Sequence, residues 1–411
     1  MSNISKQLKK ILFMCICLIW SALSLIYCMV NGYESIYNYF IKGSTLSDFY
    51  TPMVKEIENT YGSPYFSNYP PLINLLFVVL RAITGVTVQQ GNVIPNMAVY
   101  VCFAIFFIMF VSGIFLLGIK YLNEYEKSIW NYFVMFFILC SGAFLFLYQR
   151  GNILLLVIFL VGIFLENYES ENNTRHNWAI ICISIAIAIK IYPIIFVALF
   201  LIKRKWKDIM KTALFTGGFL IIPFGIYGYS TIFEFISNIF YRDTKINNVL
   251  NHAIGLKGSL KILSVYLFKH INSYSKYYTI AVILAGLMLG YIFYFSKYKW
   301  MKIAALVLAM AWMFNGSYLY NVCFFIYPLL LFFNENEKRR IDIIYLILFC
   351  NFFSIIILPD CININRILQI YSLGKISGGI MVVQISLIIF ALTMFVDTVN
   401  YRKKETSIHA V

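Results

Sequence analysis

The sequence predicts an all-α integral membrane protein, a polytopic bundle of about twelve transmembrane helices. Hydrophobic residues make up 61% of the 411 residues, charged residues make up 12%, and the mean hydropathy is +0.78. Soluble domains carry about 25% charged residues and about 45–50% apolar residues. A soluble fold of this length cannot bury so much apolar side chain, whereas lipid can cover it. We expect the outer connections to carry short interfacial helices.

A membrane-spanning helix needs roughly 20 mostly apolar residues. Twelve segments approach or exceed that length: 11–30, 70–85, 95–119, 128–147, 151–165, 178–202, 209–229, 277–295, 300–314, 317–333, 341–358 and 379–397. The first lacks a small-residue cleavage site after its apolar stretch, so it is expected to remain as a helix. Residues 1–411 are therefore treated as a single integral membrane domain.

Short basic connections set the predicted orientation, because cytoplasmic loops are enriched in Lys and Arg. With both termini inside, the cytoplasmic segments read KQLKK, KRKWKDIMK, KYKWMK, EKRR and YRKKE. The net charge of +15 is divided among these loops, which favours a topology signal over nucleic-acid binding. The prediction is a multi-pass protein of the cell membrane with both termini in the cytoplasm.

Two outer connections, 31–69 and 230–276, are much longer than the others. Long loops of this kind tend to be functional or disordered, and these two contain Tyr, Phe, Pro, Gly and charges. The nine cysteines include no Cys-x-x-Cys pair, so neither a disulfide framework nor a thiolate metal site is expected. Any chemistry is expected on loops that rest against the helix bundle.

Asp48 is the most distinctive residue of the first outer loop, because the whole chain has only 18 Asp and Glu residues. It lies in SDFYTPMVKEIE beside Tyr50, and the loop continues to Tyr69 in SNYPPL. A carboxylate that reaches a substrate hydroxyl can act as a general base, and Tyr rings suit a site that is partly apolar and partly wet. The alternative is a helix N-cap, which the local sequence alone favours.

Arg150 and Asn152 flank a glycine in YQRGNILLLV, at the start of an apolar helix. A helix N-terminus with a nearby Arg is a natural anion site, although positive-inside anchoring explains Arg150 equally well. The span assignment places Arg150 on the cytoplasmic side, unless the short helix that follows is re-entrant.

Lys190 lies near the middle of the predicted span 178–202, followed by Tyr192 and Pro193. A charge at that depth is costly and is by default a functional candidate. Pro193 removes a backbone donor and can kink the helix. The structural alternative is a lysine that is paired or extends toward an interface.

The large outer loop contains the segment NNVLNHAIGLKGSLK, with Asn251, His252 and Lys257. Backbone N–H groups and Lys257 suit a phosphate or diphosphate, and His252 can donate a hydrogen bond to it. An amphipathic helix on anionic headgroups is the alternative. Further along, Ser317 and Tyr320 are candidates to line an outward cavity or to cap a helix.

The order SDFY, NYPPLINLLF, RGNILLLVIFLVGIFL and AIKIYPIIFVALFLIKRKW resembles the multispanning GT-C glycosyltransferases, most closely glycosyltransferase family 87 and its mannosyltransferase relatives. The resemblance implies an inverting transfer from a polyprenyl-phosphate sugar, with Asp48 as general base. It also implies roles for the RGN and KxYP positions, which are Arg150, Asn152, Lys190 and Tyr192, and a donor-phosphate role for His252.

One departure concerns metal. Related enzymes that build GPI anchors carry two acids in a D-x-D pattern, whereas Ser47 is the other polar neighbour of Asp48 here. We therefore expect no metal and no cofactor.

The predicted function is transfer of a mannose-like hexose or a pentose to a hydroxyl of a lipid-linked or cell-envelope glycan on the outer face. Donor phosphate would be bound by His252, Lys257, Lys190 and Arg150, and the rest of the substrate by Tyr50, Tyr69, Asn152, Tyr192, Asn251, Ser317 and Tyr320. The expected partners are this donor, the acceptor and membrane lipids. The alternatives are a transporter or flippase that uses Lys190, and a surface polysaccharide polymerase. An acid-bearing first loop followed by YPP favours the transferase.

Overall fold

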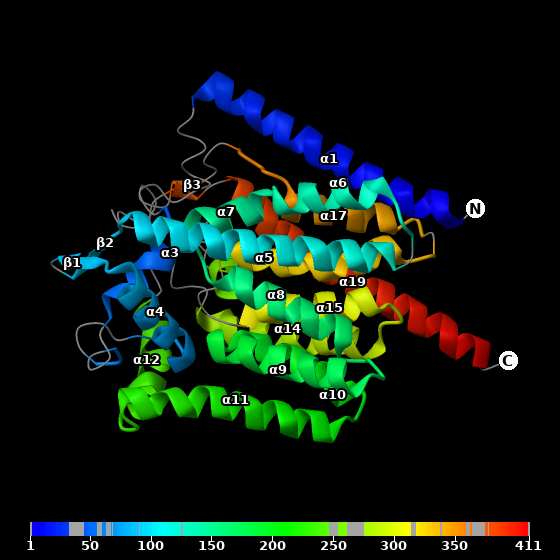
Figure 1. Cartoon of the computed structure of the whole chain (residues 1–411). Coiled ribbons are helices and arrows are strands. Elements are labelled where there is room, and N and C mark those ends of the chain that lie inside the picture. Colours follow the sequence, from blue (N-terminus) through cyan, green and yellow to red (C-terminus); the bar gives the residue numbers. More distant parts are fainter. Residues whose placement is uncertain are drawn as a thin grey trace. The chain divides into compact units, whose positions relative to one another are not determined.

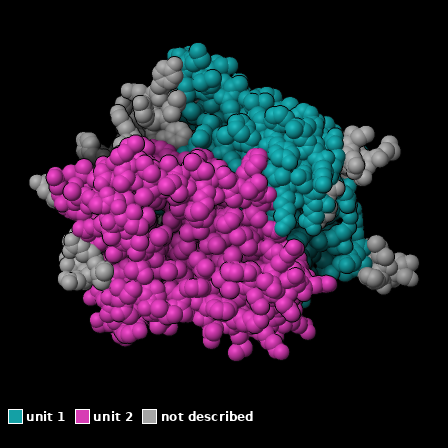
Figure 2. Space-filling model, viewed as in Figure 1, with its two compact units in different colours: residues 1–42, 118–146, 247–411 teal, residues 43–117, 147–246 magenta. Residues whose placement is uncertain are grey.

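The chain forms two compact units in the computed structural model. Unit 1 comprises Met1–Lys42, Gly118–Phe146 and Asn247–Val411, and unit 2 comprises Gly43–Leu117 and Leu147–Ile246 (Figure 2). The structure describes residues 2–32, 45–55, 60–62, 67, 69–89, 91–124, 126–245, 254–260, 275–313, 318–337, 339–358, 362–363, 375–376 and 378–409.

Almost all of the described regular structure is helical (Figure 1). The first half of the chain contains α1 (Ser2–Asn31), α3 (Ser47–Tyr50), η1 (Thr51–Val54), α4 (Pro71–Thr84), α5 (Met97–Asn123), α6 (Ile129–Leu139), α7 (Gly142–Arg150), α8 (Leu154–Asn167), α9 (Asn173–Ile189), η2 (Tyr192–Val197) and α10 (Ala198–Ile202). The second half contains α11 (Trp206–Tyr227), α12 (Thr231–Lys245), α14 (Ser275–Phe295), α15 (Lys299–Met313), η5 (Leu319–Phe325), α16 (Ile326–Asn334), α17 (Asp342–Phe353) and α19 (Gly378–His409). The described residues also form two short antiparallel pairs, β1 (Thr87–Gln89) with β2 (Asn92–Ile94) and β3 (Ile362–Asn363) with β4 (Lys375–Ile376).

The protein is a multi-pass membrane protein, and the predicted all-α class is confirmed. Among the described residues, five helices are long and apolar enough to cross a bilayer, and six if α6 and α7, bent by 52° at their break, form one span. Every one of the twelve predicted segments contains helix, but twelve full-length spans do not result. The reason is length: α8, with 14 residues, is about 21 Å long at 1.5 Å per residue, whereas the hydrocarbon core is about 30 Å thick.

The predicted single span 178–202 is wrong, because the chain turns back at Lys190. Helix α9 ends at Ile189, and Lys190 has an extended backbone with φ −139° and ψ 124°. The ring of Phe200 then packs against His176, with 6.1 Å between centroids. One continuous helix would separate residues 176 and 200 by about 36 Å. Lys190 therefore lies at a reversal and not in the middle of a span.

Unit 2 is built around α9, which packs against α8, α11 and α4 (Figure 1). Different segments of the chain lie at the two ends of unit 2. At one end, the α8–α9 and α10–α11 connections meet, as Lys203 pairs with Glu169 at 2.7 Å and Lys205 donates to the carbonyl of Tyr168 at 3.3 Å. We call this the α10 end. The opposite end, which holds α3, the turn before α8 and Lys190, is the α3 end.

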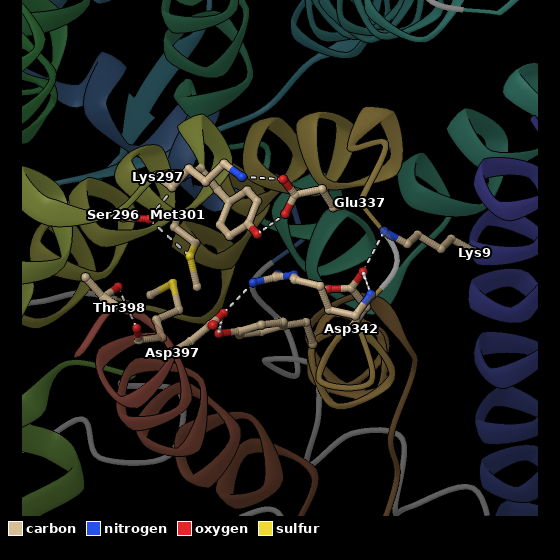
Figure 3. A network of polar contacts seen from close by, with 12 residues as sticks. Lys9, Ser296, Lys297, Met301, Glu337, Asp342, Asp397 and Thr398 are labelled. Carbon is tan, nitrogen blue, oxygen red and sulfur yellow. Dashed lines mark hydrogen bonds and ion pairs between the residues drawn. The ribbon is translucent and has the colours of Figure 1, made fainter. Parts of the chain in front are cut away.

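Unit 1 packs α14 against α15 and α1 against α17, with α17 in turn against α19. Ion pairs and hydrogen bonds join these helices (Figure 3). Arg339 donates to Asp397 at 2.6 Å and to Asp342 at 3.1 Å. Lys9 of α1 lies 2.8 Å from Asp342, and the hydroxyl of Tyr345 donates to Asp397 at 3.0 Å. This network links α1, α17 and α19.

Candidate active site

The RGN sequence forms a tight turn between α7 and α8 at the α3 end of unit 2. The N–H of Gly151 donates to the carbonyl of Tyr148 at 2.9 Å, and the N–H of Asn152 donates to that of Leu147 at 3.3 Å. Gly151 has φ +62°, a left-handed conformation that glycine adopts without steric cost. The turn thus fixes the directions in which Arg150 and Asn152 leave the backbone.

The SDFY segment docks directly on this turn. The N–H of Leu46 donates to the carbonyl of Gln149 at 2.6 Å. A Cβ atom on Gly151 would lie 3.0 Å from Cα of Leu46 and 3.1 Å from Cβ of Phe49, which is closer than ordinary contact. The glycine therefore serves two purposes, since it permits the turn and lets the first loop approach it.

Asp48 is held by both side chains of the RGN turn. Its Oδ1 forms an ion pair with the guanidinium of Arg150, and its Oδ2 accepts a hydrogen bond from Nδ2 of Asn152 at 2.7 Å. Oδ1 of Asn152 accepts from the N–H of Leu154 at 3.0 Å, so the first turn of α8 fixes the amide orientation. Asp48 and Arg150 are only 16% and 18% exposed. Charge-assisted hydrogen bonds of this kind hold a carboxylate in one orientation.

This geometry corrects two sequence interpretations. Asp48 does not cap its own helix, because the N-cap of α3 is Leu46 and no side chain caps it. The span assignment also puts Asp48 on the outer side of the membrane and Arg150 on the cytoplasmic side. Their ion pair shows that the two residues lie on the same side. The error arose from counting every apolar segment as one complete crossing.

Phe49 anchors the segment that carries Asp48. Its side chain is 1% exposed and packs against Phe103 and Phe106 of α5, with ring centroids 5.2 Å and 5.8 Å away. Burying an aromatic ring contributes on the order of 2 kcal/mol. Tyr50, the next residue, is half-buried. The acid is thus fixed by an apolar anchor on one side and by the RGN turn on the other.

Two lysines converge on the ring of Tyr69 at the same end of unit 2. The Nζ atoms of Lys55 and Lys190 each lie 4.9 Å from its centroid. The ammonium groups are therefore no more than twice that distance apart. At an effective dielectric constant of about 20, they repel each other by at least about 1.7 kcal/mol, while each cation–π contact contributes about 0.5–2 kcal/mol. The ring of Tyr69 therefore brings two ammonium groups to one place.

Asn74 of α4 organises the chain around Tyr69. It is 1% exposed, and its Nδ2 donates to the hydroxyl of Tyr61 at 3.0 Å, to Oγ of Ser67 at 3.1 Å and to the carbonyl of Tyr69 at 3.0 Å. Lys55 donates to the same Oγ of Ser67 at 2.6 Å. Several separate parts of the first loop thus meet at one buried amide.

Helix α12 supports this arrangement from the large loop. Nδ2 of Asn238, 7% exposed, donates to the carbonyls of Tyr61 and Ser67 at 2.8 Å and 3.1 Å. Tyr61 also packs in an aromatic cluster with Phe224, Tyr227 and Phe235. The two long connections at 31–69 and 230–276 are therefore joined at Asn238.

The remaining predicted residues fall in three groups. Tyr192 opens η2 two residues after Lys190 and is half-buried. Lys257 and Tyr320 belong to unit 1, where Lys257 lies 6.0 Å from the ring of Tyr278 and Tyr320 stacks on Phe146 at 5.9 Å. Asn251, His252 and Ser317 lie outside the described residues.

Within the part of the chain that the structure describes, no group of three or more His, Cys, Asp or Glu residues is arranged to hold a metal ion.

A family model for glycosyltransferase family 87 matches residues 66–317, which is more than half of the chain. The chain belongs to glycosyltransferase family 87. No curated protein and no solved structure matches it significantly. The matched range includes Tyr69, Arg150, Asn152 and Lys190. Asp48 of this family 87 glycosyltransferase precedes the matched range, so its place beside the RGN turn comes from the structure.

Sequence reasoning missed four residues of the site: Lys55, Asn74, Asn238 and Gly151. The signal for Asn74 was present, because a polar residue in the apolar run PPLINLLF requires a partner in the buried interior. Lys55 looked like an ordinary loop charge, and its contact with Tyr69 depends on how the loop folds.

Proposed function

We propose that this family 87 enzyme transfers a mannose-like hexose or a pentose from a polyprenyl-phosphate sugar to a hydroxyl group, with Asp48 as general base. The acceptor would be a lipid-linked or cell-envelope glycan. The observation that carries the proposal is the placement of Asp48, which the RGN turn holds through Arg150 and Asn152.

The orientation of Asp48 suits proton abstraction. A carboxylate has about four acceptor positions, and the two contacts described leave capacity for a substrate hydroxyl. In the reaction, the acceptor oxygen forms a bond to the anomeric carbon while its proton passes to Asp48. The bond between that carbon and the phosphate oxygen breaks, and its electron pair leaves with the phosphate. Attack from the face opposite the phosphate inverts the configuration.

Cationic groups at the α3 end suit the departing phosphate. Negative charge grows on the phosphate oxygens in the transition state, and fixed positive groups stabilise it. Arg150 and Lys190 are the candidates in unit 2. In this proposal, the guanidinium of Arg150 contacts both Asp48 and the donor phosphate. Tyr50, Tyr69, Asn152 and Tyr192 would contact the sugar or the acceptor. From the sequence alone, Lys257, Tyr320, Asn251, His252 and Ser317 are also proposed to bind substrate.

The proposed outer location follows from charge. The basic segment KRKWK, residues 203–207, lies at the α10 end of unit 2, opposite Asp48. Basic connections favour the cytoplasm, so the α3 end of unit 2 would face outward. The basic segments KQLKK and YRKKE near the two termini favour a cytoplasmic location for both termini by the same rule. Residues 45–55 and helix α12, which belong to unit 2, would then lie on the outer side of the membrane.

The test supplies purified protein in nanodiscs with radiolabelled polyprenyl-phosphate mannose, glucose or arabinose and a membrane extract as acceptor. Transfer of label from one donor supports the reaction class. Asp48→Asn should reduce transfer by about 10²–10⁴-fold, the usual contribution of a general base. The matched control is Asp208→Asn, which removes a carboxylate 2.9 Å from His176 at the α10 end and should leave transfer intact. Unchanged transfer in Asp48→Asn overturns the assignment.

A further inference from the structure

We infer that Lys55 is a further substrate-binding residue, which forms with Lys190 and Tyr69 a site for the phosphate group of the donor. This inference rests on the proposed function for the identity of the donor. The site itself is argued from the positions of three side chains in unit 2.

The two ammonium groups come from segments distant in sequence. Lys55 follows η1, and its N–H donates to the carbonyl of Pro52 at 3.3 Å. Lys190 lies at the reversal between α9 and η2. Both Nζ atoms lie 4.9 Å from the ring centroid of Tyr69. Two backbone segments that are far apart in sequence thus place two positive charges beside the ring of Tyr69.

The site is built and not a chance surface encounter. Lys55, Lys190 and Tyr69 are all half-buried, so the lysines are partly desolvated. Lys55 is oriented by Oγ of Ser67 at 2.6 Å, and Ser67 is 2% exposed. Asn74 fixes both Ser67 and the carbonyl of Tyr69. The position of Lys55 is therefore set by buried hydrogen bonds.

A phosphate is the ligand that fits this arrangement. A tetrahedral phosphate offers several oxygens to separate donors, so two ammonium groups beside one ring can donate to the same phosphate. Lysine binds phosphate as a point charge and needs no planar geometry. Tyr69 contributes an apolar ring edge, which suits a ligand whose phosphate is joined to a lipid and a sugar.

The binding experiment uses farnesyl phosphate as probe, with the full-length protein in phosphatidylcholine nanodiscs. The apparent Kd is taken from the rise in unfolding temperature with probe concentration. Lys55→Gln and Lys190→Gln should each weaken binding about tenfold, as expected for a charge-assisted contact, and Lys55→Arg should retain most of it. Lys211→Gln is the control, because Lys211 is exposed and donates to Asn177 near the α10 end.

Separate arms identify the source of the phosphate. Farnesol, which lacks the phosphate, should bind equally to wild type and Lys55→Gln. Inorganic phosphate that competes with the probe only when Lys55 is present supports a site for phosphate itself. If phosphatidylglycerol nanodiscs compete with the probe only when Lys55 is present, the same site is supported, with a lipid headgroup as its occupant. The inference is overturned if Lys55→Gln binds farnesyl phosphate as tightly as wild type does. It is also overturned if Lys55→Gln weakens the binding of farnesol as much as it weakens the binding of farnesyl phosphate. Asp48→Asn should retain probe binding, so failure of the proposed reaction is seen separately, in the transfer assay.

Discussion

Replacing Gly151 by alanine tests the docking of the first loop on the RGN turn. Alanine at φ +62° is strained by about 1–2 kcal/mol, because Cβ approaches the following carbonyl in a left-handed conformation. The new Cβ would also lie 3.0 Å from Cα of Leu46 and 3.1 Å from Cβ of Phe49. Both contacts are with atoms close to the main chain, which cannot move as a flexible side chain does.

The steric cost of this crowding is about 1–3 kcal/mol, the usual range for overpacking. Together with the backbone strain, Gly151→Ala should cost about 2–5 kcal/mol if the loop remains docked. The loop can instead move away, and then Asp48 leaves Arg150 and Asn152. Either outcome lowers stability or transfer.

Gly85 provides a matched control in the same unit. It has φ +57°, and an added Cβ would meet nothing within 4 Å. Gly85→Ala therefore carries the strain of a left-handed alanine without the crowding. The assay compares unfolding temperature in detergent and sugar transfer for the two variants. Gly151→Ala should be worse than Gly85→Ala in both measurements. Equal effects would refute the argument that close approach at Gly151 holds the first loop in place.

Three further predictions concern the supports of the two units. Asn238→Ala leaves two buried carbonyls of the first loop without their donor, so unfolding should become easier by about 1–3 kcal/mol, measured by denaturant titration. Asp397→Asn removes a partner of the partly buried Arg339 and should cost about 2–3 kcal/mol in thermal unfolding, whereas the exposed Glu405→Gln should cost less than about 1 kcal/mol. The pKa of Glu337 is lowered from 4.5 by hydrogen bonds from Lys297 and Tyr298, so its stabilisation is present above about pH 4.5 and is lost as the pH falls through the lowered value. Glu337→Gln should therefore reduce slightly the loss of folding stability at acid pH, and the effect is small because the pair is exposed. A stability that falls with decreasing pH as steeply in the variant as in wild type would contradict this.

The sequence predicts the helical class and many of the site segments because both depend on local patterns. Apolar runs mark helices, and the RGN turn follows from local chemistry because it needs a glycine at φ +62°. Contacts across about one hundred residues are different. The pairing of Asp48 with Arg150 requires that α7 end on the same side as the first loop, and hydropathy does not distinguish a full crossing from a short helix that stops within the bilayer.

Lys190 shows the same limit at one residue. The run from 178 to 202 is apolar enough for one span, so Pro193 was interpreted as a kink. In the structure, Pro193 lies in the first turn of η2, a position that proline favours because its missing N–H is not needed there. A lysine and a proline close together in an apolar run thus accompany a chain reversal here. The packing of Phe200 against α8 and α9 favours the reversal over a kinked span, and the local sequence does not predict that packing.

Single-turnover transfer at saturating donor and acceptor decides whether Asp48 takes the acceptor proton. Asp48→Asn should lower the transfer rate by about 10²–10⁴-fold while farnesyl phosphate binding is retained. Transfer by Asp48→Asn at the wild-type rate, or a loss that is restored fully when the variant is stabilised by lower temperature, would contradict it.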